Sequence, residues 1–286
     1  MKFYHILLFF IFLFVSYSNA KTPATLSKMN GELDFLNYSA SAKLAEKIRK
    51  KTKVGSDKWL KSTFALALSL HQRQPDVKSE KLRAEKLYNE LIKNSEGKII
   101  QAKAMILLAR MASERDYLND KSDNSKAKRL YSEVIKKFPN TQVSDMAALF
   151  KAHLYVFSTN KEEIIEGINF TKEWLKKRPT NVFASLQYSL ISDRYYRYFN
   201  DPKRAVEYSL EAERAGLPPL IQLDHFYWNV ANKAELAGMT NLAVKYYKKV
   251  ITDVVSSGFA YESQMRLREL GVEPPKLIDP FAVQEK

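Results

Sequence analysis

The sequence predicts an all-α protein, an α–α superhelix of about five helix pairs followed by a closing helix. Only 8 glycines and 10 prolines occur in 286 residues, which favours long helices joined by short loops over a turn-rich β fold. Apolar residues also recur at helical spacing along the chain. In the clearest case, 127–139 (AKRLYSEVIKKFP), they line one face, basic residues fill the other, and Pro139 ends the pattern.

The first 20 residues are expected to be a secretory signal peptide. The apolar run 6–15 is shorter than the roughly 20 residues of a membrane span, and residues 18–20 (SNA) resemble a cleavage site. The mature chain would begin at Lys21, and an uncleaved amino-terminal anchor is the alternative. Because the sequence has no cysteine, it can form no disulfide and carry no lipid on a cysteine, so packing must supply its folding energy.

The rest of the chain divides by composition and periodicity. Residues 21–32 are polar and aperiodic, which predicts a flexible tether, and an amino-terminal helix is expected over 33–55. The helical-repeat domain should span 56–270, with 259–270 as its closing helix. Residues 271–286 contain three prolines and are expected to form a carboxy-terminal tail.

A small residue returns in the second helix of each predicted pair, at intervals of 43, 40, 38 and 38 residues: Ala84, Ala127, Gly167, Ala205 and Ala243. Four positions later stand Tyr88, Tyr131, Thr171, Ser209 and Tyr247, and three further on stand Leu91, Val134, Trp174, Ala212 and Val250. In two repeats a proline closes the helix, at Pro139 and Pro179. Small residues let neighbouring helices approach and large ones fill the gap, so we assign these positions to repeat packing.

This pattern resembles the tetratricopeptide repeat, a helix-turn-helix unit of about 34 residues. The best match is 227–255, where Tyr227, Ala231 and Ala234 occupy first-helix positions and Gly238 marks the turn. All intervals here exceed the family's period. The resemblance implies a right-handed solenoid whose first helices line a concave surface that binds another protein or a peptide.

By alignment, the candidate partner-binding residues on that surface are Lys103, Arg110, Phe150, His153, His225, Trp228, Asn232 and Glu235. An exposed stripe of aromatic and charged side chains suits a peptide or a partner helix. The alternative is that these side chains belong to the core, because apolar residues at helical spacing are more often buried than functional.

No catalytic motif, metal site or cofactor site is predicted, so we expect a protein without enzymatic activity. His71, His153 and His225 fall in three different repeats, too far apart to share one metal ion. The sequence also lacks a Gly-rich phosphate loop and a nucleophile elbow. A cell-wall-active enzyme would need paired carboxylates across the groove, and Asp193 with Glu235 is the only pair we can nominate.

The formal net charge of +14 suits anionic partners, although the favoured explanation is that lysines on solvated helix faces keep the protein in solution. For an exported chain we expect an acidic protein or peptide, with peripheral contact to anionic envelope components, and no nucleic acid. Residues 138–147 (FPNTQVSDMA) are similar to helix-pair junctions in repeat proteins of the bacterial envelope. The sequence therefore predicts a periplasmic or extracellular scaffold. The alternative is a module that binds or acts on anionic envelope polymers, for which Tyr196 and Arg197 are candidate contacts.

Overall fold

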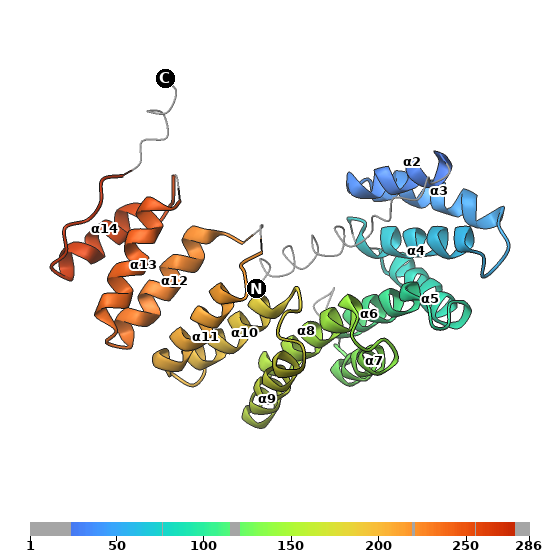
Figure 1. Cartoon of the computed structure of the whole chain (residues 1–286). Coiled ribbons are helices and arrows are strands. Elements are labelled where there is room, and N and C mark those ends of the chain that lie inside the picture. The colour runs from blue at the N-terminus through green and yellow to red at the C-terminus, as the bar shows by residue number, and fades with distance from the viewer. Residues whose placement is uncertain (1–23, 76, 115–120, 219–220, 255, 278–286) are drawn as a thin grey trace, which may run out of the picture. The chain divides into compact units, whose positions relative to one another are not determined.

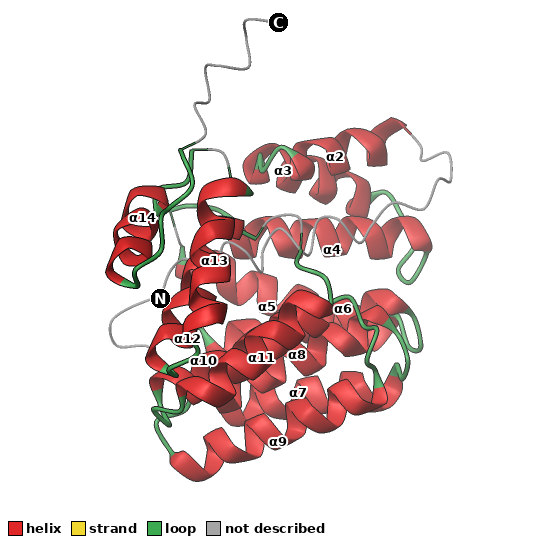
Figure 2. Ribbon diagram, turned by 60° about the vertical axis from the view of Figure 1, so that its left-hand side comes forward, coloured by secondary structure: helices red, strands yellow, loops and turns green. Residues whose placement is uncertain are grey.

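The computed structural model describes residues 24–75, 77–114, 121–218, 221–254 and 256–277, and the predicted signal peptide lies outside them. These residues form thirteen α-helices and contain no strand (Figures 1 and 2), which confirms the prediction of an all-α fold. Helices pack mainly on their neighbours in the chain, as expected of a helical-repeat protein. Within the described residues, none of the helices combines the length and apolar character that a membrane span requires.

The chain forms two compact units, Met1–Leu154 and Tyr155–Lys286, which are described separately. The first unit holds α2 (Ala24–Asp34), α3 (Tyr38–Lys50), α4 (Asp57–Gln72), α5 (Lys78–Asn94), α6 (Ile99–Ser113) and α7 (Asn124–Lys137). The division falls inside α8 (Gln142–Val156). The second unit holds α9 (Lys161–Lys177), α10 (Ala184–Arg197), α11 (Pro202–Arg214), α12 (Leu223–Leu236), α13 (Thr240–Thr252) and α14 (Ala260–Glu269).

The predicted tether over 21–32 is wrong from Ala24 onward, because α2 begins there. Leu26 and Met29 are buried, and the hydroxyl of Ser41 donates to the Met29 carbonyl at 3.3 Å, which fixes α2 on α3. Leu26, Met29 and Leu33, spaced three and four residues apart, suffice to bury one face of this short helix. Among so many polar neighbours, that stripe gave too weak a periodic signal to be recognised.

The single helix predicted over 33–55 is also wrong, since a turn separates α2 from α3. Leu36 has a positive φ of 58°, a left-handed conformation that no helix interior accommodates. Asn37 then caps α3, its side-chain oxygen accepting from the backbone N–H of Ala40 at 3.2 Å. The described part of the chain therefore starts with a helix pair, α2 and α3, that precedes the five predicted pairs.

The predicted pairing of helices appears in both units. In the first unit α4 packs on α5 and α6 on α7; in the second α10 packs on α11 and α12 on α13, and α14 closes on α13. After α14 the tail runs back along it, because the side-chain amide of Gln264 donates to the Pro275 carbonyl at 2.9 Å. Residues 271–277 contain no helix.

The repeated small residues lie where helices touch. All five are buried, as are the residues four positions later: Ala84, Ala127, Gly167, Ala205, Ala243, Tyr88, Tyr131, Thr171, Ser209 and Tyr247. Trp174 is half-buried. Pro139 and Pro179 are exposed and directly follow the residues that cap α7 and α9, so they end helices and do not pack between them.

Candidate functional site

The first unit contains a buried ionic network at the ends of α4 and α6. Arg110 donates two hydrogen bonds to one carboxylate oxygen of Glu114, from Nη2 at 2.8 Å and from Nε at 3.2 Å. On the other side, Nε2 of His71 lies 3.8 Å from Glu114, and its Nδ1 lies 3.4 Å from the hydroxyl of Tyr88. Burial alone would raise the pKa of Glu114. The His71 imidazole beside the carboxylate and the charge of Arg110 outweigh it and lower this pKa to about 2.

Two predicted partner-binding residues, Arg110 and Phe150, belong to this core. They are 8% and 6% exposed, and the Arg110 guanidinium lies 5.7 Å from the centre of the Phe150 ring. That ring also stacks on Tyr131 at 5.9 Å. Their assignment to an open concave surface is therefore wrong, because the guanidinium packs on the Phe150 ring and that ring packs on Tyr131. The alternative of core side chains applies to both.

Lys103 and His153, the other two candidates of the first unit, are half-buried. Burial lowers the pKa of the Lys103 ammonium. Lys103 lies on α6 and His153 on α8, which are first helices of two consecutive pairs. Both side chains are partly exposed, and their contact with a partner stays a prediction.

The candidates of the second unit share one helix, α12, and divide between surface and packing. His225 is exposed, whereas Trp228 is half-buried between two rings, at 5.3 Å from both Phe259 and Tyr247. Asn232 and Glu235 accept from the hydroxyl of Tyr247, at 2.9 Å and 2.7 Å. The amino-terminal half of α12 therefore offers a contact surface, while its carboxy-terminal half secures α13.

Asp193 and Glu235, nominated for cell-wall chemistry, are engaged separately. Asp193 pairs with Arg194 at 2.7 Å and with Arg197 at 2.5 Å. Glu235 accepts from Tyr247 and lies 3.8 Å from Arg266. Each carboxylate therefore has partners of its own, Asp193 on α10 and Glu235 on α12.

Sequence reasoning missed a buried lysine in the second unit. Lys233 on α12 is 9% exposed, and its ammonium donates to the hydroxyls of Ser192 at 2.9 Å and Ser209 at 3.4 Å. Ser192 in turn donates to the Ala205 carbonyl at 2.6 Å, and the Tyr196 ring centre lies 5.7 Å from the ammonium. A lysine between Ala231 and Ala234, on the apolar face of α12, was the available signal. A lysine looks like an ordinary solvated charge unless its position on the helix is compared with that of the apolar residues.

The electrostatics of Lys233 give a stability prediction. Burial lowers its pKa to about 8, with Asp193 acting to raise it and Arg197 to lower it further. Between pH 8 and 10.5 the unfolded chain binds the proton that the folded chain has released, so the free energy of unfolding rises with pH. Below pH 8 Lys233 is charged in the folded chain, so the whole cost of burying the charge is subtracted from the free energy of unfolding.

Lys233→Met is therefore expected to stabilise the second unit at pH 7 by about 1–3 kcal/mol, because it removes a buried charge while the Ser192–Ser209 hydrogen bond at 2.7 Å stays. Urea unfolding followed by circular dichroism between pH 7 and 10.5 measures the effect. The rise with pH should disappear in the variant. Equal slopes in wild type and variant would mean that Lys233 does not titrate in this range.

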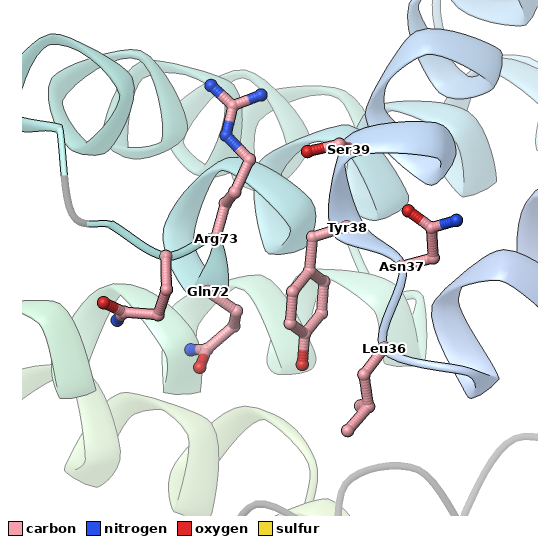
Figure 3. Close-up of a pocket in the computed structure, with 7 residues that line it drawn as sticks. Leu36, Asn37, Tyr38, Ser39, Gln72 and Arg73 are labelled. Atoms are coloured by element: carbon pink, nitrogen blue, oxygen red, sulfur yellow. The ribbon is translucent and has the colours of Figure 1, made fainter.

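An open pocket of about 290 Å³ lies between the α2–α3 turn and the end of α4 (Figure 3). It is lined by a mixture of polar and apolar residues: Leu36, Asn37, Tyr38, Ser39, Gln72, Arg73 and Gln74. Burial raises the pKa of Tyr38 to about 12, and Arg73 pairs with Glu80. The pocket thus offers a neutral phenol and amides, a composition that fits hydrogen bonding to a partner rather than acid–base catalysis at neutral pH.

Within the described parts of the chain, no group of three or more His, Asp or Glu side chains is placed to hold a metal ion. The ring nitrogens of His71 face Tyr88 and Glu114, and His225 contacts Phe259 and Asn229. A scan of protein-family models finds no match to this chain, and a search of curated proteins finds no relative.

Proposed function

We propose that this protein is a non-catalytic scaffold of tetratricopeptide-like repeats, exported to the cell envelope, that binds another protein or a peptide. The observation that carries the proposal is the recurrence of a buried small residue in five successive second helices, from Ala84 to Ala243. Repeated helix pairs of this kind build extended surfaces rather than enclosed catalytic clefts. Export rests on the signal-like residues 1–20.

The amino-terminal half of α12 is the strongest partner surface under this proposal. There the exposed His225 stands beside Trp228, a large aromatic side chain that is partly accessible and held rigidly between two rings. A preordered aromatic anchor loses little conformational freedom on binding, which is why such residues dominate interface energies. In the first unit, Lys103 and His153 occupy comparable first-helix positions.

Site-specific photo-cross-linking in the native cells tests the proposal. A benzophenone amino acid at His225 or Lys103, both on first helices, is expected to capture one discrete protein partner. The same group at Lys176 or Lys136, exposed on the second helices α9 and α7, serves as the matched control. Equal capture from all four positions, or none from His225 and Lys103, would contradict a first-helix binding surface.

The charge balance favours one further candidate function, binding of an anionic envelope polymer. Lys and Arg outnumber Asp and Glu by 46 to 32. Binding of this kind depends strongly on ionic strength, because exposed charges are screened over a Debye length of about 8 Å at physiological salt. A partner held by the aromatic surface of α12 would remain bound in 0.5 M NaCl, whereas a polymer held by charge alone would be released.

A further inference from the structure

We infer that Lys233 on α12 and Arg197 on α10 form a binding site for a phosphate group in the second unit. The inference stands independently of the proposed protein-binding function. It rests on the local charge balance: Arg194 and Arg197 both pair with the carboxylate of Asp193, and the Lys233 ammonium contacts Ser192 and Tyr196 on the same helix, α10. The cluster therefore carries a net charge of +2, part of it buried.

Both oxygens of Asp193 are already engaged by the two arginines. One carboxylate oxygen lies 2.7 Å from Arg194 Nη2 and the other 2.5 Å from Arg197 Nε. No carboxylate of the described residues lies within 4 Å of the Lys233 ammonium, whose hydrogen-bond acceptors are neutral hydroxyls. Arg110, the buried arginine of the first unit, has Glu114 as its counter-charge. A buried cation without such a partner is costly, and a bound anion would remove that cost.

Arg194 adds a second sign of incomplete neutralisation. Its Nε is buried and has no hydrogen-bond partner in the described part of the chain, and its guanidinium lies 4.2 Å from the ring centre of Phe157. The cation is held by a ring and by one oxygen of Asp193. Within the described residues, one buried donor of the cluster therefore has no acceptor.

The size of the excess charge selects the ligand. A phosphate monoester carries about −1.5 to −2 at pH 7 and matches the +2 of the cluster, whereas one carboxylate would leave about half of it. Arg197 binds Asp193 through Nε, and its side chain is 66% exposed, so its terminal amines can meet two phosphate oxygens as a fork. Lys233 supplies the second positive charge. The half-buried ring of Tyr196, on the same helix as Arg197, has its centre 5.7 Å from the Lys233 ammonium.

Isothermal titration calorimetry of the full chain with inorganic phosphate, in chloride buffer of matched ionic strength, tests the site. Wild type is expected to bind one phosphate saturably. Lys233→Met and Arg197→Gln should each raise the Kd at least about tenfold, because each removes a direct charge contact. Lys136→Gln, an exposed lysine on α7 of the first unit, should bind as wild type does. Circular dichroism confirms that each variant is folded.

Two vesicle compositions distinguish the source of the phosphate. Flotation with vesicles containing phosphatidic acid, compared with phosphatidylcholine alone, reports a headgroup ligand. Binding to phosphatidic acid that Lys233→Met abolishes would support the site and assign it to a lipid, while binding to free phosphate alone would assign it to a soluble ligand. Absence of both, or wild-type affinity in both site variants, would overturn the inference.

Discussion

Glu114→Ala is expected to destabilise the first unit by about 3–5 kcal/mol at pH 7, because it leaves the buried Arg110 cation without its counter-charge. The same change removes the acceptor that lies 3.8 Å from Nε2 of His71. Urea unfolding followed by circular dichroism measures the loss as an earlier transition of this unit.

A double variant separates the charge effect from the loss of packing. Arg110→Met with Glu114→Met removes both charges and keeps apolar bulk against Phe150, so it should recover most of the stability that the single variant loses. Lys137→Ala breaks the exposed Lys137–Glu133 pair and should cause no measurable change. A loss below about 1 kcal/mol in Glu114→Ala would mean that water reaches Arg110 in solution.

The acid limb of the stability curve provides an independent check on Glu114. Its pKa is about 2 in the folded chain and 4.5 in the unfolded one, so the stabilisation is complete above pH 4.5. It is lost as the pH falls toward 2, because the unfolded chain takes up the proton first. The difference corresponds to about 3 kcal/mol, and Glu114→Gln should lack this part of the acid dependence.

The helix pairs could be predicted from the sequence because their signal is local. Ala127, Tyr131 and Val134 lie on one turn-by-turn stripe, and the structure buries all three. Small residues recur wherever two helices must approach closely, so spacing alone located Ala84 and Ala243 as well. The resemblance to a repeat family added an expected binding groove, and two of the residues assigned to it, Arg110 and Phe150, are buried.

The buried polar groups could not be predicted, since burial of a charge depends on residues distant in sequence. Arg110 and Glu114 stand at the end of α6 and read as solvated charges until Phe150 and His71 are seen to cover them. Lys233 likewise depends on Ser192, 41 positions earlier. The same limit misplaced Phe150 on an open surface, because helical phase alone does not tell a groove from a core.

Gly167→Val is expected to destabilise the second unit by about 3 kcal/mol, through overpacking where α9 meets the end of α8. A Cβ at Gly167 would stand 2.5 Å from Cβ of Tyr155 and 3.1 Å from the backbone nitrogen of Val156. Neither neighbour is the flexible end of a side chain, so the helices themselves must separate, and valine adds two methyl groups to the clash. Thermal unfolding followed by circular dichroism measures the effect.

Gly31→Ala is the matched control for Gly167, because both glycines lie within helices. Nothing lies within 4 Å of a Cβ at Gly31, so alanine there should stabilise α2 by about 0.5–1 kcal/mol through its higher helix propensity. Alanine at Gly167 gains the same propensity but must also displace Tyr155. If Gly167→Ala stabilised the chain as much as Gly31→Ala, α9 would not approach Tyr155 closely. The small residue of this repeat would then have no packing role.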